Sequence, residues 1–358
     1  IYSAALERGF GPDTVVNDAP LFFDAGSTGS QAWEPKNYDG TFDGPLPLRR
    51  ALARSKNMVS IRVLQSIGPG YAQQWITRFG FEAEKHPAYL PMALGTGSVT
   101  PLQMASAYSV FANGGLRITP RLINRITDNR GRVLKEQTSA EPGSTVRTID
   151  ARNAFLMSSL LQEVTRSGTA ARAQGTLKRP DLYGKTGTTN DSMDAWFAGY
   201  QQSLVAVVWI GYDTPRSLGS HASGSSLALP AWIQYMATAL AKEPVQDIPV
   251  PEGVIQTESG WRYLEWANGG FIRELGAGDA PIDRSLIPMP PDPSASESLE
   301  PDLTPQSEHV GGAHDDAAHP AETKTDAKPD NKEPRKSILD KLFERPAALP
   351  EPVRTAVR

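Results

Sequence analysis

The chain has 358 residues, of which 39% are hydrophobic and 21% are charged, so it is long enough and apolar enough for at least one large core. Its formal net charge of −4 at pH 7 argues against a nucleic-acid-binding protein. The absence of cysteine excludes a disulfide framework, a thiolate metal site and a cysteine nucleophile.

The start of the chain predicts a helix end followed by an irregular segment. The opening stretch IYSAALERGF indicates a helix already under way that Gly9 closes. Because the first residue is not Met, we expect the chain to begin within a longer protein. Residues 11–48 are rich in Gly, Pro, Asn and Asp, and they predict a long irregular segment held by Trp33, Tyr38 and Phe42.

Helical spacing of apolar residues dominates the next part of the chain. Thr100 and Gln103 form the pattern of a capping box, and Asp150 is placed as an N-cap. Residues 121–136 predict a hairpin that turns at 129–131. No run of about 18 apolar residues occurs, so no membrane-spanning helix is predicted within the chain. Helices are predicted for residues 57–67, 70–79, 101–113 and 151–167.

Strand patterns replace helical ones after residue 182. The segments YGKTGTT, DAWFAGY and SLVAVVWIGYD predict three sequential strands, and LALPAWIQYMATALA predicts a closing helix. The apolar run 204–210 suits a central strand covered on both faces. Helices, an antiparallel sheet and a further helix over it indicate an α+β layered domain.

Composition divides the chain into three parts. We expect the main domain to cover residues 1–245 and a C-terminal extension, residues 246–288, to dock on it through its aromatic side chains. Residues 289–358 are rich in Pro and charged residues with a single aromatic, which predicts a disordered acidic tail. Three of the five histidines lie in that tail, so a histidine-based metal site is disfavoured and no cofactor is expected.

Gly184, Lys185 and Thr186 raise the question of a phosphate-binding loop. Such a loop needs a further glycine five residues before Gly184, so that backbone N–H groups can surround the phosphates. The chain has Arg179 at that place, and Pro180 after it lacks an N–H group. The local sequence therefore argues against nucleotide binding.

The same residues also suit a strand that binds a peptide. A sheet edge can accept an extended peptide by strand addition, and Gly187 has no Cβ to hinder its approach. Thr186 and Thr188 share one face of a regular strand, where two hydroxyls can meet one carboxylate. Lys185 supplies a compact positive charge that attracts such a group. An ordinary exposed edge strand that carries a lysine remains the plain alternative.

Ser55, Lys56 and Asn57 form a second polar element at the junction between two helical stretches. Ser and Asn are common N-cap residues, so a helix cap is the plain interpretation of this element. Together with the strand residues it takes on a second meaning. Ser55-x-Asn57 and Lys185-Thr186-Gly187 resemble, in the right order, the second and third motifs of the penicillin-recognising serine enzymes.

The flanking stretches resemble one branch of those enzymes, the transpeptidase domain of class A, bifunctional penicillin-binding proteins. They are DAP, WEPKNYDGTFDGPLPLRRALARSKN, ALGTGSVTPLQMASAYSVFANGG, GKTGTTND, DAWFAGY and VVWIGYD. The resemblance covers residues 1–245, fades through 246–285 and does not include the tail. It implies the fold of the serine β-lactamases and penicillin-binding proteins: an antiparallel sheet of about five strands flanked by helices, next to a mostly helical lobe.

The resemblance also implies a mechanism in which a serine nucleophile of a Ser-x-x-Lys motif forms an acyl-enzyme. No serine of this chain has a lysine three residues later. We therefore expect the nucleophile and its lysine base just before Ile1, and we expect this chain alone to be inactive.

By resemblance, Ser55 relays a proton to the leaving nitrogen, Asn57 hydrogen-bonds the substrate amide, and Lys185 tunes the electrostatics of the cleft. The strand residues Thr186, Gly187 and Thr188 are expected to bind substrate, the two threonines through its carboxylate. The backbone N–H of Thr188 is expected to form half of an oxyanion hole, whose other half belongs to the nucleophile.

The partners that the resemblance implies are peptidoglycan stem peptides with their lipid-linked precursor, β-lactams, and regulators of cell-wall synthesis, and they do not include nucleic acid. The parent protein is expected at the outer face of the cytoplasmic membrane, held by an anchor that this chain lacks and joined to a glycosyltransferase domain. Four alternatives stay open: a non-catalytic protein of this fold that binds wall peptides, a scaffold acting through residues 289–358, a hydrolytic carboxypeptidase and, less favoured, a β-lactamase.

Overall fold

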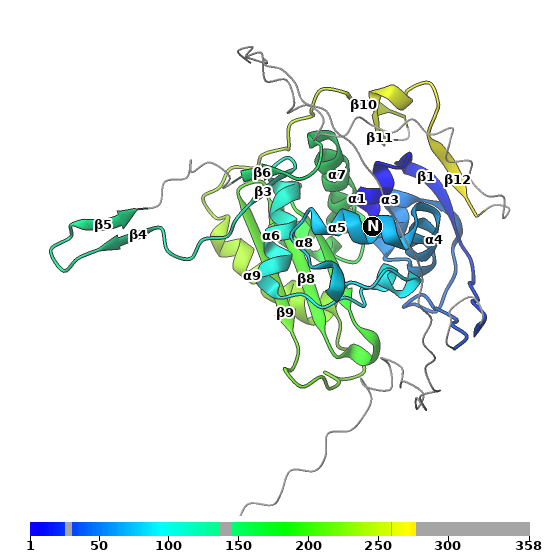
Figure 1. Ribbon diagram of the computed structural model, residues 1–358, viewed down its shortest axis with the longest axis horizontal. Helices are drawn as coiled ribbons and strands as arrows, with labels where there is room; N and C mark the ends of the chain where they lie inside the picture. Colours follow the sequence, from blue (N-terminus) through cyan, green and yellow to red (C-terminus); the bar gives the residue numbers. More distant parts are fainter. Residues whose placement is uncertain (26–30, 137–144, 259, 277–358) are drawn as a thin grey trace, which may run out of the picture. The chain divides into compact units, whose positions relative to one another are not determined.

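A computed structural model describes residues 1–25, 31–136, 145–258 and 260–276 (Figure 1). All of these belong to one compact unit. The predicted tail, residues 289–358, and the last part of the predicted extension lie outside the described residues. No helix in the described ranges is both long and apolar enough to cross a lipid bilayer.

The main sheet is antiparallel and has the strand order β7-β8-β9, formed by β7 (Tyr183–Thr188), β8 (Ala195–Gln201) and β9 (Leu204–Ile210). These are the three strands predicted from the sequence. The expected place of β9 is wrong: β8 is central, and β9 lies at an edge of the described sheet with its residues only partly buried. A run of apolar residues indicates that a strand is buried, but it does not indicate which strands pair with that strand.

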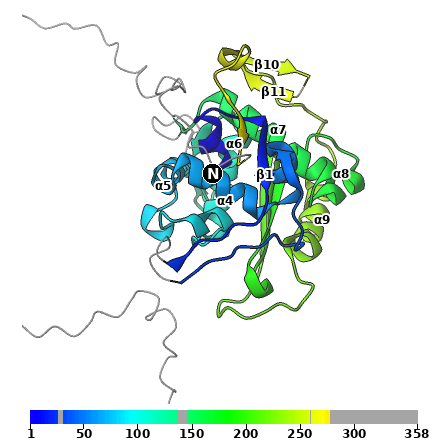
Figure 2. The same ribbon diagram turned by 90° about the vertical axis from the view of Figure 1, so that its right-hand side faces the viewer.

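Helices cover both faces of this sheet (Figures 1 and 2). Tyr108 of α6 (Pro101–Ala112) packs against Tyr200 of β8. Trp232 of α9 (Leu229–Ala239) packs against Phe197 of β8 and donates to the Ala206 carbonyl of β9. Because side chains alternate along a strand, residues 197 and 200 point to opposite faces. The helices therefore lie on opposite sides of β8, and an α+β layered domain is confirmed.

Not all of the remaining helices lie beside the sheet: α7 (Ala151–Ser167) packs on it, since its Ser158 Oγ lies 2.8 Å from the Tyr200 hydroxyl of β8. The capping box of α6 forms as predicted, with Thr100 and Gln103 bonded to each other's backbone N–H groups. Asp150 caps α7, also as predicted. The other helices are α1 (Tyr2–Leu6), α3 (Leu48–Arg54), α4 (Asn57–Ile67), α5 (Pro69–Thr77) and α8 (Ala171–Leu177), with short turns η1 (Ala83–Lys85), η2 (Leu90–Leu94), η3 (Asn190–Ser192), η4 (Gly224–Ala228) and η5 (Leu264–Trp266).

A second sheet has the order β12-β1-β2, formed by β12 (Ile272–Leu275), β1 (Phe10–Asp18) and β2 (Gly44–Pro47). Strand β12 runs parallel to β1, and β2 runs antiparallel to it. The sequence predicted one sheet of about five strands, whereas each of these two sheets has three described strands. The other strands are β3 (Leu116–Ile118), β4 (Arg125–Thr127), β5 (Val133–Glu136), β6 (Thr145–Arg147), β10 (Val254–Thr257) and β11 (Gly260–Tyr263).

The segment from residue 11 to residue 48 differs from its prediction. It contains most of β1 and all of β2, and only Trp33 of the three expected aromatic anchors stacks on another ring, that of Phe23. The side chains of Tyr38 and Phe42 are 73% and 41% exposed. Aromatic anchoring of this segment is therefore wrong for both residues. Its anchors are polar side chains, because they make the buried contacts described below.

Candidate functional site

Ser55 lies at the joint between α3 and α4. It is the C-terminal cap of α3 in the left-handed conformation, with φ 58° and ψ 45°, which is uncommon for a residue other than glycine. The N-cap position of α4 belongs to Lys56, whose side chain makes no capping bond. The interpretation of Ser55 as a helix N-cap is therefore wrong, and its hydroxyl is left for a contact outside both helices.

That contact is with Lys185 of β7, which lies 130 residues later in the chain. The Nζ of Lys185 donates to Ser55 Oγ over 2.8 Å and to the carbonyl oxygen of Thr186 over 3.0 Å. Burial of the ammonium lowers the pKa of Lys185 to about 8, and no carboxylate of the described chain forms an ion pair with it. A lysine with that pKa is mostly protonated at pH 7 and donates to Ser55 Oγ, so the hydroxyl proton of Ser55 is available to another acceptor.

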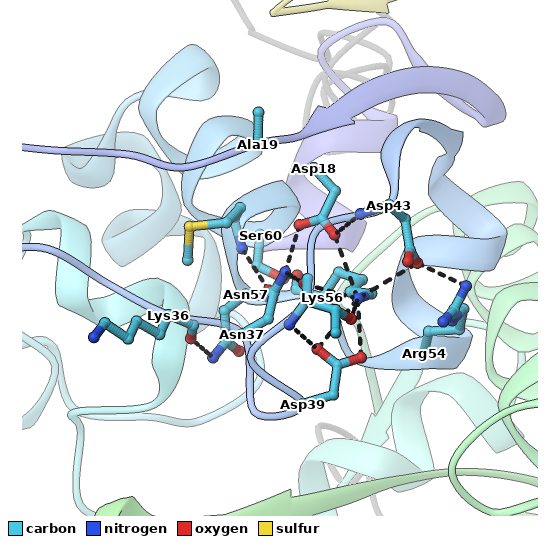
Figure 3. Close-up of polar contacts among 12 residues, drawn as sticks. Asp18, Ala19, Lys36, Asn37, Asp39, Asp43, Arg54, Lys56, Asn57 and Ser60 are labelled. Carbon is cyan, nitrogen blue, oxygen red and sulfur yellow. Dashed lines mark hydrogen bonds and ion pairs between the residues drawn. The ribbon is translucent and has the colours of Figure 1, made fainter.

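Asn57 is the first residue of α4 and is partly buried. Its side-chain Nδ2 donates to the Lys36 carbonyl over 2.7 Å, and its backbone N–H donates to Asn37 Oδ1 over 2.8 Å (Figure 3). Both contacts come from one loop, which holds the side-chain amide and the backbone of Asn57 together. The structure thus brings Ser55 together with Lys185, and it fixes Asn57 two residues further along.

The two threonines of the β7 motif are two residues apart and share a face of the strand, and the Nζ of Lys185 reaches the hydroxyl of Thr186 over 3.4 Å. Their hydroxyls have different partners. Thr186 Oγ1 lies 2.7 Å from Thr169 Oγ1, whereas Thr188 Oγ1 accepts from the backbone N–H of Gly224 over 3.0 Å. That the two hydroxyls bind one carboxylate stays a prediction.

Thr169 is a residue of the site that the sequence did not point out. Its backbone N–H donates to the Ala53 carbonyl in the last turn of α3 over 2.9 Å, and its hydroxyl meets Thr186. The preceding residue, Gly168, lies so close to α3 that a Cβ there would be 2.2 Å from the Ala53 oxygen. The pair 168–169 therefore connects the helix end that carries Ser55 to the strand that carries Lys185. The sequence signalled only a glycine after a helix.

A cavity of about 630 Å³ lies along β7. Residues 185–189 form one wall, and Met104 and Tyr108 of α6 contribute to another. Trp196 and Trp209 of the sheet add apolar surface, while Ser55 and Asn57 lie outside the lining. The site therefore joins an apolar cavity to a polar junction, and Lys185 belongs to both. Such a combination suits a ligand that has an extended backbone and a carboxylate.

Comparisons with known proteins agree with this geometry. The family model named "Penicillin binding protein transpeptidase domain" matches residues 1–228. Penicillin-binding protein 1A of Neisseria gonorrhoeae is 40% identical over 344 residues, which cover 96% of this chain and 42% of that protein. A crystal structure of penicillin-binding protein 1A from Haemophilus influenzae has a TM-score of 0.67 at 36% identity and covers 72% of this chain and 43% of that chain.

A third comparison concerns the fold alone. The structure of PonA1 from Mycobacterium tuberculosis in complex with penicillin V has a TM-score of 0.57 at 23% identity, and the match covers 73% of this chain and 71% of that chain. The chain spans less than half the length of the gonococcal relative that it matches.

Proposed function

The chain belongs to the penicillin-binding protein transpeptidase domain family, and from this we propose that its parent protein cross-links peptidoglycan stem peptides through a serine acyl-enzyme. The observation that carries the proposal is the 2.8 Å contact between Lys185 Nζ and Ser55 Oγ, because it joins the two motifs at one point. β-Lactams, which acylate the same serine in such enzymes, are the inhibitors that we expect to bind.

The reaction has two acyl-transfer steps. A serine hydroxyl attacks the carbonyl carbon between two D-alanines, the C–N bond breaks, and D-alanine leaves with a proton on its nitrogen. The amine of a second stem peptide then attacks the ester and releases the serine. Because no Ser-x-x-Lys motif occurs in the chain, we propose that a segment outside it supplies the nucleophile and its lysine base.

Ser55 is the proposed donor of the proton to the leaving nitrogen. The oxygen of Ser55 accepts a hydrogen bond from Lys185, so the hydroxyl proton of Ser55 remains free to be donated to the leaving nitrogen. Asn57, held by Lys36 and Asn37, is the proposed partner of the substrate amide. The N–H of Thr188 is the proposed oxyanion donor, and loss of one such donor typically costs about 3 kcal/mol in the barrier.

Location and partners follow from this substrate. We propose that the parent protein works at the outer face of the cytoplasmic membrane, where peptidoglycan and its lipid-linked precursor are found, and that it carries a glycosyltransferase domain as well. Regulators of cell-wall synthesis are further proposed partners. The chain by itself has no Ser-x-x-Lys, and this favours a second function for it alone, the reversible binding of wall peptides without acylation.

A labelled penicillin tests both statements by mass spectrometry of the intact protein. We expect no covalent adduct on this chain alone, and an adduct on a chain extended at its N-terminus to include a Ser-x-x-Lys motif. In the extended chain, Ser55→Ala should slow acylation about 100-fold or more if the proton relay is needed. Ser109→Ala is the matched control, because its hydroxyl donates within α6 to the Ser106 carbonyl.

Two results would contradict the proposal. An adduct on the chain alone would show that it contains a nucleophile outside any Ser-x-x-Lys motif. Equal acylation rates for Ser55→Ala and the unmodified extended chain would remove Ser55 from the mechanism.

A further inference from the structure

Lys56, the middle residue of the Ser55-x-Asn57 motif, has its side chain 1% exposed. A lysine this buried stays charged only with partners around it. Its Nζ lies 3.0 Å from Asp39 Oδ2 and 3.4 Å from both Asp18 Oδ2 and Asp43 Oδ2 (Figure 3). It also donates to the Thr41 carbonyl over 3.2 Å. Three carboxylates and a carbonyl thus surround one ammonium.

The carboxylate of Asp18 extends this cluster toward α4. Asp18 is fully buried at the end of β1, and it accepts from Asn37 Nδ2 over 2.7 Å and from the Asp43 backbone N–H over 2.9 Å. Asn37 Oδ1 in turn accepts from the backbone N–H groups of Asn57, over 2.8 Å, and Met58, over 3.3 Å. Asn37 therefore caps α4 from a loop 20 residues upstream, in the place where Lys56 makes no capping bond.

The charges of the cluster fit this arrangement. Desolvation alone would lower the pKa of Lys56, but the hydrogen bond to Asp39 and the charges of Asp18, Asp39 and Asp43 outweigh it and raise that pKa. Arg54 pairs with Asp43 from the outer side over 2.7 Å. The N-terminal end of α4, which carries partial positive charge, is linked to Asp18 through Asn37, whose amide bonds to both. The described cluster is thus a charged anchor with cations on both sides of Asp43.

Lys56 and Ser55 are neighbours in the chain whose side chains have separate partners. The hydroxyl of Ser55 contacts Lys185 in β7, and the ammonium of Lys56 is enclosed by the loop 36–43 together with Asp18. Enclosure to 1% exposure keeps Lys56 from touching a substrate. What Lys56 can do is hold the loop that binds Asn57, and fix the backbone between Ser55 and Asn57.

We propose that Lys56 is a positioning residue for acyl transfer: by binding Asp18, Asp39 and Asp43 it anchors the loop 36–43, which caps α4 and sets the places of Ser55 and Asn57. The inference rests on the proposed function for its catalytic consequence. The structural part of the inference, that Lys56 anchors the start of α4, depends only on the contacts within this chain.

Amide hydrogen exchange in the chain as it exists tests the structural part. Lys56→Met keeps the length of the side chain and removes the cation, and we expect the N–H groups of Asn57 and Met58 to exchange at least about tenfold faster. The exchange of β8 should stay unchanged. Lys85→Met is the matched control, because it removes a lysine from an exposed ion pair with Glu82. If Lys56→Met does not fold, Asp39→Asn carries the same test, since the side chain of Asp39 is 45% exposed and its loss is milder.

Acylation of the extended chain by a labelled penicillin tests the catalytic part. Lys56→Met or Asp39→Asn should acylate about tenfold or more slowly per folded molecule, because small misplacements of reacting groups are costly in rate. Lys56→Arg, which keeps the charge, should restore part of the rate. A merely structural role predicts a rate that falls only in step with the folded fraction, measured by circular dichroism.

The outcomes separate the two proposals. Unchanged exchange at Asn57 and Met58 in the folded variant overturns the anchoring. Faster exchange with an unchanged acylation rate overturns the positioning role. If the unmodified extended chain is not acylated, the proposed function is overturned, while the hydrogen-exchange result still tests the anchoring by Lys56.

Discussion

The pKa of Lys185 is lowered to about 8 because folding shields its ammonium from water, while no carboxylate among the described residues pairs with it. The only groups within reach are neutral acceptors, among them Ser55 Oγ and the Thr186 carbonyl, in the part of the chain that the structure describes. A lowered lysine pKa suits a proton-transfer site, because a group that gains and loses a proton near neutral pH can take part in catalysis.

Lys185→Met should change the pH dependence of stability. Between pH 8, the folded pKa, and pH 10.5, the ordinary value, the unfolded chain binds more protons, so the free energy of unfolding of the unmodified chain rises with pH. Across that pH window we expect the free energy of unfolding of the unmodified chain to rise by about 1–3 kcal/mol relative to that of Lys185→Met. The lower end of this range takes account of screening by solvent. Urea unfolding at pH 7 and pH 10 measures the difference. If the free energies of unfolding of the unmodified chain and of Lys185→Met differ by the same amount at both pH values, the lowered pKa of Lys185 is contradicted.

At the scale of elements, the site depends on how closely α3 approaches the end of α7. Gly168 follows α7 with φ −100° and ψ −154°, a backbone conformation that other residues also adopt. The need for glycine is therefore steric. The Ala53 carbonyl of α3 fills the space of a Cβ, and Thr169 bonds to the same oxygen. Ser55 follows two residues after Ala53, so this close contact also bears on the proton relay.

Gly168→Ala should force the two helix ends apart. We expect a loss of about 1–3 kcal/mol in the free energy of unfolding, as for other overpacked sites. Gly175→Ala is the matched control: Gly175 lies within α8, where an added Cβ would meet open space. There alanine should stabilise the helix by about 0.5–1 kcal/mol. Urea unfolding of both variants checks the difference in sign, and a similar effect in both would refute the steric argument.

At the scale of the whole described molecule, residues 254–276 close over the N-terminal part. Strand β12 pairs with β1, Tyr263 donates to Glu7, and Trp261 packs edge-on against Phe155 of α7. Arg152 of α7 pairs with Glu265. Segments that are far apart in the sequence thus lie side by side, and strand β1 ends at Asp18 in the Lys56 cluster.

Removal of this closing segment should weaken the fold. A chain ending after residue 253 loses the buried side chains Val254, Tyr263, Trp266 and Ile272, whereas a chain ending after residue 276 keeps them. Burial of that much apolar surface is worth on the order of 5 kcal/mol, so the shorter chain should melt at a clearly lower temperature. Calorimetry of the two chains makes the comparison, and equal melting temperatures would show that residues 254–276 add no stability.

Local signals account for the elements that the sequence predicted well. Caps and periodicity depend on residues only a few positions apart, so Thr100 and Asp150 could be predicted as the N-caps of α6 and α7. Strand β1 was missed because its sequence, FGPDTVVND, mixes turn residues with apolar ones. The edge position of β9 was missed because it depends on which strands pair.

The sequence by itself determined the family, the two motifs and the order of those helices and strands that local patterns predict, because each of these depends on residue types at short spacing. Only the tertiary structure decided that Lys185 meets Ser55 across 130 residues, that Thr169 bridges α3 and β7, and that Lys56 lies buried among three aspartates. Contacts over such separations follow from packing of the whole chain, which brings distant groups together only once the cores that carry them have formed.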